Sequence, residues 1–336
     1  MAVSLAAATA ADLGARIYAA VREGHAPDIH GVVVIQDGRL VVERYFEGPD
    51  EGLGRPLGRI AFEPGTLHDL RSVTKSIVGL LYGIALHQGK VPAPDAPLLA
   101  QFPEYADLAA EPARRRLTVG HALTMTLGLE WDESIPYSDP ANSERAMEAA
   151  ADRHRFTLER QIVAEPGRTY RYNGGASALL ALLISKGTGR DLEDFARAAL
   201  FDPIGIGRTE WHRGRDGLPL AAAGLRMTPR DLARIGRLVL DGGRWDGKPV
   251  VPAVWLRESF KPHVAIEGDR FYGYHWYVST TPRRQITAIG NGGQRLFVLP
   301  DQCVAVAIAA GAYNRPDQSK APLALLNEVV LPSLRG

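Results

Sequence analysis

Cysteine is almost absent from this sequence, and so is an excess of either charge. Cys303 is the single cysteine in 336 residues, which excludes an intramolecular disulfide and a cysteine-rich metal site. The 39 basic side chains balance 38 acidic ones, and a net charge of +1 provides no field that would gather nucleic acid or an anionic membrane. We therefore expect no nucleic-acid partner and no membrane partner. Cys303 begins an apolar run, and this position predicts a buried, inert thiol.

Long apolar runs and paired metal ligands are missing as well. No stretch approaches the roughly 18 apolar residues that a transmembrane helix requires. The Ala-rich start has no basic residue before Arg16, so no intact signal peptide is seen; we expect a cytoplasmic location, or a periplasmic one if a leader was trimmed. The nine histidines lack His-x-His or His-Glu-x-x-His spacing, and we predict no metal and no organic cofactor. A metal site assembled from distant residues stays open.

Strand signals gather at the two ends of the chain. Asp37-Gly38 between two β-branched runs predicts a hairpin over residues 31–46. Four further strands are predicted over residues 272–279, 285–289, 295–299 and 304–309. This order predicts an α+β fold, an α/β sandwich in which one antiparallel sheet is built from both chain ends and flanked by helices.

Helical signals fill the middle of the chain and flank the strands. Apolar spacing predicts helices over residues 10–23, 72–86, 118–125, 158–163, 176–186, 192–200, 229–240 and 321–334. We therefore predict a sheet domain formed by residues 1–95 and 236–336. Residues 96–235 are predicted to form an inserted helical subdomain, with the active site in the cleft between the two.

The head of the apolar helix at 72–86 holds the first candidate for chemistry. Ser72 and Lys75 are three residues apart, so both side chains lie on one helix face. If burial held Lys75 neutral, it would take the proton of Ser72, whose backbone N–H at the helix start would face an oxyanion. A helix cap at Ser72 beside a solvated Lys75 is the alternative interpretation.

Two glycine-rich segments add to this pattern. In the first, residues 166–184, Tyr172 precedes an apolar helix, where a phenol would relay protons in a cleft or simply pack a loop. The second, residues 288–300, is a strand, a glycine turn and another strand. Its glycines would let a backbone N–H approach a substrate oxygen. A hairpin without any catalytic role is the alternative interpretation of the same residues.

Together the three segments resemble those of the serine β-lactamase and penicillin-binding-protein superfamily, which carries a Ser-x-x-Lys motif. The closest resemblance is to its esterase and amidase branch, the family VIII carboxylesterases and 6-aminohexanoate-dimer hydrolases. It covers nearly the whole chain and implies the β-lactamase/transpeptidase-like fold. Segments that share it are residues 28–31, 123–128, 227–233, 273–276 and 290–294.

The resemblance implies a role for each matching residue. Ser72 would be the acylated nucleophile, Lys75 its general base and Tyr172 the proton shuttle. The oxyanion hole would consist of the backbone N–H groups of Ser72 and Asn291, or of Ser72 and Gln294 under a second alignment of the third motif.

Two departures from the family pattern bear on the substrate. Gly174 stands where the lactamase motif Tyr-x-Asn has its asparagine, and Asn173 comes one place early. The third motif lacks the lysine whose ammonium meets a substrate carboxylate in lactamases and transpeptidases. Both differences favour neutral esters or small amides, unless Arg295 or another arginine replaces the missing charge.

Further candidates for substrate contact surround these motifs. Trp131 and Tyr137 belong to a loop, residues 131–142, that we predict to cover the cleft and offer apolar surface, unless they only pack the loop. The others are Asn173, Gly174, Gly290 and Gly292.

The sequence thus predicts a serine hydrolase that cleaves a small ester or amide through an acyl-enzyme on Ser72. A β-lactamase or D-amino-acid peptidase is the first alternative. A catalytically silent binding or sensor protein on the same scaffold is the second, and an acyltransferase stays open. The natural substrate and the oligomeric state are not determined by the sequence.

Overall fold

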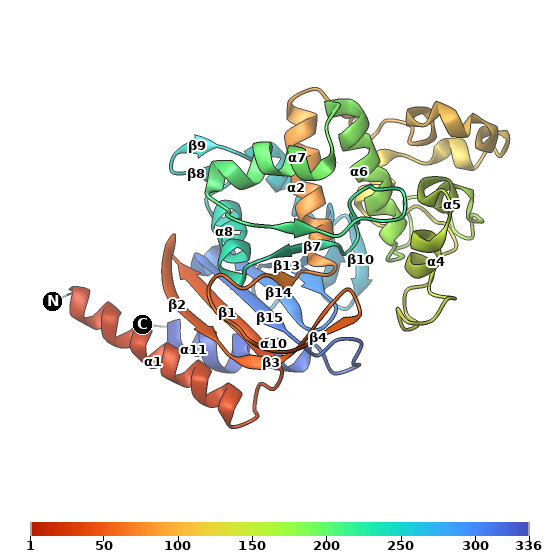
Figure 1. Ribbon diagram of the computed structural model, residues 1–336. Helices are drawn as coiled ribbons and strands as arrows, with labels where there is room; N and C mark the ends of the chain where they lie inside the picture. Colours follow the sequence, from red (N-terminus) through yellow and green to blue (C-terminus); the bar gives the residue numbers. More distant parts are fainter. Residues whose placement is uncertain (1, 335–336) are drawn as a thin grey trace.

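The computed structural model describes the backbone of residues 2–334 and the side chains of residues 12–334. Its centre is an eight-stranded antiparallel sheet in which the first two strands of the chain continue a sheet formed by the last six (Figure 1). This confirms the predicted sheet from both chain ends and the α+β class. The order is β10 (Val264–Glu267), β11 (Arg270–Tyr272), β12 (Tyr277–Ser279), β13 (Gln285–Gly290), β14 (Gln294–Leu299), β15 (Val304–Ala310), β1 (Ile29–Gln36) and β2 (Arg39–Tyr45).

The predicted hairpin joins β1 to β2. Asp37 and Gly38 have φ values of 50° and 71°, as a type I′ turn requires, and the twist of that turn matches the twist of the paired strands. β1 is buried from Ile29 to Ile35, without the alternation of a strand that faces solvent. The strand is therefore covered on both faces.

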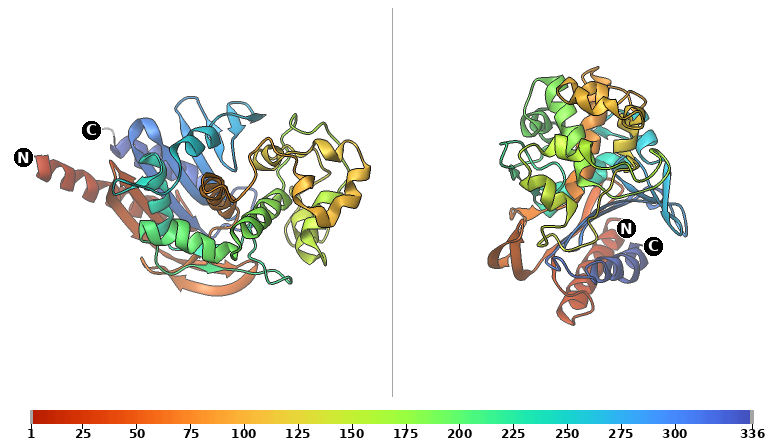
Figure 2. Two further views of the ribbon diagram at one scale, coloured as in Figure 1. Left: turned by 90° about the horizontal axis from the view of Figure 1, so that it is seen from above. Right: turned by 90° about the vertical axis from the view of Figure 1, so that its right-hand side faces the viewer.

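Helices cover the two faces of the sheet (Figure 2). On one face, α1 (Ala2–Arg22) and the C-terminal segment α10 (Lys320–Ala324), η7 (Leu325–Val330) and α11 (Leu331–Leu334) pack in one buried cluster with Phe297 and Val306. The neighbouring residues Leu296 and Ala305 point the other way, toward α8 (Pro229–Leu240). α2 (Val73–His87) also lies on that second side, against β13 and β14.

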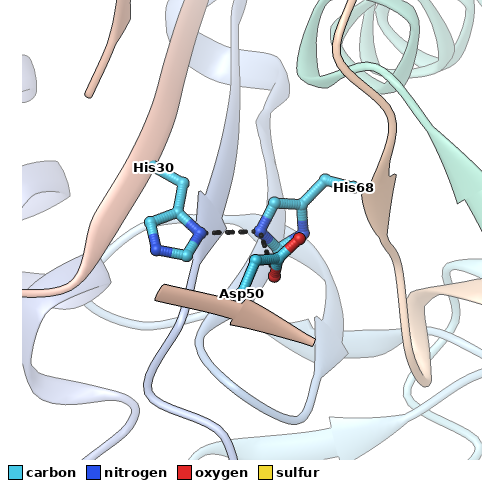
Figure 3. Close-up of side chains that lie close together, drawn as sticks. All are labelled: His30, Asp50 and His68. Carbon is cyan, nitrogen blue, oxygen red and sulfur yellow. Dashed lines mark hydrogen bonds and ion pairs between the residues drawn. The ribbon is translucent and has the colours of Figure 1, made fainter. Parts of the chain in front are cut away.

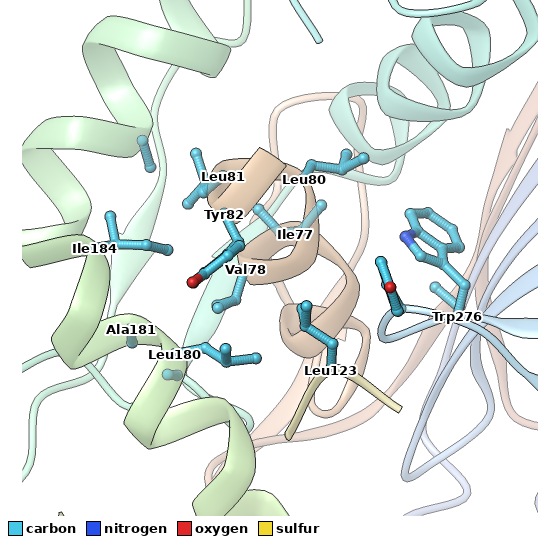
Figure 4. Close-up of a cluster of buried hydrophobic side chains, with 14 of the residues drawn as sticks. Ile77, Val78, Leu80, Leu81, Tyr82, Leu123, Leu180, Ala181, Ile184 and Trp276 are labelled. Atoms are coloured by element: carbon cyan, nitrogen blue, oxygen red, sulfur yellow. The ribbon is translucent and has the colours of Figure 1, made fainter. Parts of the chain in front are cut away.

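The helices of the middle region pack around α6, and α6 packs against α2. They are α3 (Val119–Leu123), α4 (Ser143–Ala149), α5 (Arg153–Glu159), α6 (Gly174–Thr188) and α7 (Leu192–Ala196). Leu180 and Ile184 of α6 face Val78 and Leu81 of α2 (Figure 4), and this buried cluster continues to the sheet. The division into two domains stays a prediction, and its boundary at residue 235 falls inside α8.

Short elements make up the rest of the described chain. The strands are β3 (Glu47–Gly52), β4 (Arg55–Ala61), β5 (His68–Asp69), β6 (Glu210–Trp211), β7 (Leu225–Met227), β8 (Arg244–Trp245) and β9 (Lys248–Pro249). The helical segments are η1 (Leu99–Gln101), η2 (Pro103–Ala110), η3 (Arg114–Arg116), η4 (Arg197–Phe201), η5 (Asp202–Ile204), α9 (Ala253–Ser259) and η6 (Pro300–Gln302).

The prediction of a buried Cys303 is wrong. Cys303 is exposed and has a φ of 52°, because it ends η6 in a tight turn before β15 begins at Val304. The continuously buried run of β15 therefore begins one residue after it.

Two predicted elements also differ in extent. The helix predicted over 158–163 ends at Glu159, because the backbone of Val163 and Gln161 bonds instead to Gly128 and Glu130. The single strand predicted over 272–279 is broken into β11 and β12, since residues 273–276 leave the ladder and pack against α2.

Among the helices that the structure describes, none combines the length and the hydropathy that crossing a membrane would need.

Candidate active site

Ser72 stands at the N-terminal end of α2, and its hydroxyl makes no hydrogen bond to the helix backbone. The preceding residue, Arg71, has a left-handed φ of 49°, which costs energy for any residue with a Cβ. Ion pairs to Glu51 at 2.7 Å and to Asp69 at 3.1 Å hold Arg71 in place. The Ser72 side chain makes no capping hydrogen bond, so the helix does not consume the hydroxyl and the capping interpretation fails.

Lys75 is buried, with 1% of its side chain exposed, and is not solvated. Nζ donates to Ser72 Oγ at 3.1 Å, to Glu144 Oε2 at 3.2 Å and to the carbonyl of Ala222 at 2.9 Å. Three acceptors match the three donors of an ammonium. Burial alone would lower the pKa of Lys75, but the carboxylates of Glu144 and Glu133 raise it above its ordinary value. The resting Lys75 is therefore charged, whereas the predicted general base needs a neutral amine.

Tyr172 reaches the same point from the loop before α6. Lys75 Nζ lies 4.7 Å from the centroid of its ring, and Tyr172 lines the larger cavity together with Ser72. Burial, and then the neighbouring Tyr277 and Glu133, raise the pKa of Tyr172 well above its ordinary value. The phenol is therefore protonated at rest. The structure brings Ser72, Lys75 and Tyr172 together, as predicted.

Two carboxylates that the sequence analysis missed complete the surroundings of Lys75. Glu144 comes from α4, and Glu133 comes from the loop before it. Glu133 Oε1 accepts from the backbone N–H of Gly174 and from Trp131 Nε1, both at 2.6 Å. Burial, and then the charge of Glu144, raise the pKa of Glu133 to about 7. The one feature of the sequence that bears on these carboxylates is Gly174, which replaces the asparagine of the motif. A Cβ at this position would overlap Glu144 Oε2.

Two cavities open beside Ser72, one of about 480 Å³ and one of about 180 Å³. Both are lined by Ser72, Asn291 and Tyr137, so the predicted covering loop does reach the cleft. The larger cavity is also lined by Glu133, Tyr172, Tyr277, Ile289, Gly290 and Arg295. The smaller one is also lined by Leu53, Arg71, Glu144, Arg145, Leu220 and Ala222.

The turn between β13 and β14 distinguishes Asn291 from Gln294, the two candidates for the second N–H group of the oxyanion hole. Asn291 follows β13 directly and lines both cavities beside Ser72. The backbone N–H groups of Ser72 and Asn291 have no hydrogen-bond partner among the described residues. Gln294 instead pairs with Gly290 in the ladder, and its buried side chain bonds the backbone of Ala310. The geometry therefore puts Asn291, and not Gln294, beside Ser72 in the two cavities.

Arg295 provides a buried cation in the larger cavity. Its guanidinium donates to the carbonyls of Gly290 and Gln294 and to Ser319 Oγ, at 2.6–3.1 Å. No carboxylate among the described residues forms an ion pair with it, and burial lowers the pKa of Arg295 to about 10. Three bonds leave two of its five N–H donors without a protein partner. The Arg295 guanidinium can therefore bind an anion through these two donors.

Trp131 and Asn173 do not line either cavity, and substrate contact by these two residues stays a prediction. Trp131 is 2% exposed and packs with Met147 and Ala178, and its indole N–H holds Glu133. Asn173 is the N-cap of α6, where its Oδ1 accepts from the backbone N–H of residue 176 at 3.1 Å. Both residues are turned toward the core.

Gly174 and Gly292 are likewise structural rather than lining residues. Gly174 gives its backbone N–H to Glu133 and leaves room for Glu144. Gly292 has a φ of 89°, donates its N–H to Gln318 and packs against the Tyr313 ring. Of the predicted glycine contacts, Gly290 lines the larger cavity.

Three buried residues with metal-binding atoms meet where β1, β3 and β5 come together (Figure 3). One ligand atom each from His30, Asp50 and His68 lies within 4.8 Å of the other two. However, His30 Nδ1 and His68 Nε2 are 2.9 Å apart, a direct hydrogen bond, and Asp50 accepts from the Tyr313 hydroxyl at 2.9 Å. This is a hydrogen-bonded cluster that joins β1, β3 and β5. Its members are far apart in the sequence, so no metal motif marked them.

Comparisons with known proteins agree with this geometry. A family model described as Beta-lactamase matches residues 17–328. The chain is 25% identical over 281 residues to 6-aminohexanoate-dimer hydrolase of Paenarthrobacter ureafaciens, covering 77% of this chain and 69% of that protein. It is similar in structure to EstCE1, a hydrolase with promiscuous acyltransferase activity (TM-score 0.72, 16% identity, 96% of this chain and 99% of that one). It is also similar to a penicillin-binding protein from Bacillus halodurans (TM-score 0.68, 17% identity, 89% and 97%), and these likenesses confirm the β-lactamase/transpeptidase-like fold.

Proposed function

The chain belongs to the serine beta-lactamase family of hydrolases, and on this basis we propose that it cleaves a small carboxylic ester or amide through an acyl-enzyme on Ser72. One arrangement carries the proposal. An uncapped Ser72 hydroxyl lines a cavity while it contacts both Lys75 and Tyr172. A serine hydroxyl becomes an effective nucleophile when a neighbouring group removes its proton, and these two side chains are the groups in contact with it.

In the acylation step, Ser72 Oγ bonds to the carbonyl carbon of the substrate. The proton of Ser72 passes to the Tyr172 oxygen while the phenol proton passes to the departing alcohol or amine, so Tyr172 ends the step as it began. The ion pair with Glu144 favours Lys75 as an ammonium. We therefore assign Lys75 the stabilisation of negative charge on Oγ through its N–H donor, in place of the general-base role expected from the resemblance.

The tetrahedral intermediate places negative charge on the former carbonyl oxygen. We assign its stabilisation to the unpartnered backbone N–H groups of Ser72 and Asn291. Water then attacks the acyl carbon. Its proton returns through Tyr172 to Ser72 Oγ as the acyl bond breaks, which releases the carboxylic acid and restores the enzyme.

The charge of Arg295 narrows the substrate class. A buried guanidinium with two unused donors and no carboxylate partner favours a substrate that brings its own carboxylate into the larger cavity. This differs from the neutral substrates favoured by the missing third-motif lysine, since Arg295 supplies the cation from the neighbouring strand. Linear amides or esters that end in a carboxylate are therefore the proposed substrates.

Initial rates on three compounds test the proposal. They are p-nitrophenyl butyrate, a neutral ester; the linear 6-aminohexanoate dimer, an amide with a free carboxylate; and nitrocefin, a β-lactam. Ser72→Ala is compared with Ser76→Ala, which removes a buried hydroxyl from the same helix, bonded to the His275 carbonyl.

We expect ester or amide turnover to exceed nitrocefin turnover, and Ser72→Ala to lose more than about 1,000-fold while Ser76→Ala stays within about tenfold of wild type. Dominant nitrocefin turnover would identify a β-lactamase instead. A folded wild type that is inert on all three compounds would contradict the enzyme proposal.

A further inference from the structure

Glu144 reaches the nucleophile from a separate part of the fold. It lies in the first turn of α4, which begins at Ser143, whereas Lys75 lies on α2. Glu144 Oε2 is 3.2 Å from Lys75 Nζ, and the two side chains are 9% and 1% exposed. An ion pair so shielded from water attracts far more strongly than one at the surface. The contact therefore bears directly on the charge of Lys75.

The space for this carboxylate exists because residue 174 is glycine. A Cβ built on Gly174 would overlap Glu144 Oε2 and lie 2.9 Å from Glu144 Cδ. Any larger residue at 174 would push the Glu144 carboxylate away from Lys75. Gly174 and Glu144 are thus complementary in shape, and the departure from the Tyr-x-Asn pattern has a structural counterpart on α4.

Other titratable side chains also face Lys75 and could affect its charge. They come from α4 and the loop before it, the loop before α6, β11, β12 and the segment between those strands: Glu144, Glu148, Glu133, Tyr172, Tyr272, Tyr277 and His275. Within the described residues, Glu144 is the one carboxylate bonded to Nζ. Glu133 is bonded to Gly174, Trp131 and Tyr137, and Glu148 is paired with Arg153 at 2.9 Å.

We infer that Glu144 is a positioning residue of the active site: its carboxylate, seated in the space left by Gly174, holds Lys75 as an ammonium that donates to Ser72 Oγ. The inference rests on the proposed function for its catalytic meaning. The charge state of Lys75, however, can be measured without turnover. Failure of one proposal is therefore distinguishable from failure of the other.

The direct test follows the Cε resonance of Lys75 by NMR in protein labelled with [13Cε]lysine. The labelled positions are Lys75, Lys90, Lys186, Lys248, Lys261 and Lys320, and Lys75→Arg identifies the resonance of interest. We expect the pKa of Lys75 in wild type to lie above that of an ordinary lysine, because the carboxylates of Glu144 and Glu133 favour the ammonium. In Glu144→Gln its pKa should fall by about one pH unit or more, because burial then acts without the bonded carboxylate.

Glu144→Asp and Glu130→Gln complete the set. The aspartate keeps the charge, so it should restore much of the wild-type titration. Glu130 pairs with Arg160 in the same helical region with half of its side chain exposed, and its replacement should leave Lys75 unchanged. An unchanged titration of Lys75 in Glu144→Gln, or a Lys75 already neutral at pH 8 in wild type, overturns the inference.

The kinetic counterpart is the basic limb of the pH profile of kcat/KM. If the ammonium is the working form, this limb should move to lower pH in Glu144→Gln by the same amount as the Lys75 pKa. A merely structural Glu144 would lower the rate without moving the limb, and a Glu144→Gln variant more active than wild type near pH 8 would mean that Lys75 works as a neutral base. Either result overturns the inference.

Gly174→Ala provides a second route should Glu144→Gln fold poorly. It keeps every charge in the chain but displaces the Glu144 carboxylate by overlap. We expect the same downward shift of the Lys75 pKa, and combining Gly174→Ala with Glu144→Gln should add little. A Gly174→Ala protein with wild-type melting temperature and wild-type Lys75 titration contradicts the inference.

Discussion

Arg295 is the side chain that we propose to select substrates with a carboxylate in the larger cavity. Replacing it by glutamine should raise KM for the linear aminohexanoate dimer by about 10- to 100-fold, the equivalent of one or two lost charge-assisted hydrogen bonds. KM for p-nitrophenyl butyrate should change by less than about threefold, since that ester brings no carboxylate.

Arg315→Gln is the matched control for this prediction, because Arg315 lines the same cavity but is neutralised by Asp28 at 2.6 Å and Asp317 at 2.8 Å. Its KM values should stay near wild type. Equal losses for both substrates in Arg295→Gln would show that Arg295 only supports the turn that carries Asn291.

Glu133 should make substrate binding depend on pH near neutrality. Its pKa of about 7 means that the carboxyl is neutral below this pH and negative above it. The negative form repels a substrate carboxylate in the shared cavity, so KM for the dimer should rise as pH increases through about 7. In Glu133→Gln this rise should vanish, and p-nitrophenyl butyrate should show no rise in either protein. A dimer KM that is flat with pH in wild type contradicts this assignment.

The site residues differ in how far the sequence could identify them. Ser72, Lys75 and Tyr172 stand in local motifs, and the resemblance of these motifs to those of a known superfamily predicted them, whereas spacing alone left a helix cap and loop packing as alternatives. Glu133 and Glu144 belong to no motif and reach Lys75 only when the chain folds. Their effect on Lys75 is an interaction across the cleft, and no local pattern encodes it.

Tyr172 directly precedes α6, Asn173 is the N-cap of this helix and Gly174 begins its first turn. Asn173→Ala should lower the free energy of unfolding by about 0.5–2 kcal/mol, whereas Asn173→Asp keeps an acceptor and should lose little. A fraying first turn would disturb Tyr172, so kcat should fall more than KM rises. Denaturant unfolding and steady-state kinetics on the three proteins check this. A large KM increase at unchanged stability would instead restore Asn173 as a substrate contact.

The elements themselves were predicted best where the signal is local. The Asp37-Gly38 turn and the apolar spacing of α2, α6 and α8 each specify one structure, and these elements agree with the prediction within a few residues. The helix α4 was missed because Ser143–Ala149 is short and has little apolar periodicity. Its position depends on Met147, which is buried against Trp131 and Ala178.

At the scale of the whole molecule, the buried cluster on one side of the sheet joins the sheet to the helical middle region, while a separate cluster lies under α1 and the C-terminal helices. A single cluster contains Ala305 of the sheet, Leu80 of α2 and Leu180 of α6. The predicted subdomain of residues 96–235 therefore shares its apolar contacts with α2, and we expect one cooperative unfolding transition. Far-UV circular dichroism and tryptophan fluorescence in urea should give coincident curves. Two separated transitions, or an isolated fragment 96–235 that folds alone, would contradict this.

Covalent acylation of Ser72 is the step on which the proposed reaction depends, and mass spectrometry of the intact protein detects it. Wild type is treated with an activated organophosphonate, the adduct is weighed, and the modified peptide is sequenced. We expect one adduct per chain, located on Ser72. It should be absent from Ser72→Ala and retained in Ser76→Ala. An unmodified wild type, or an adduct that persists in Ser72→Ala, would contradict it.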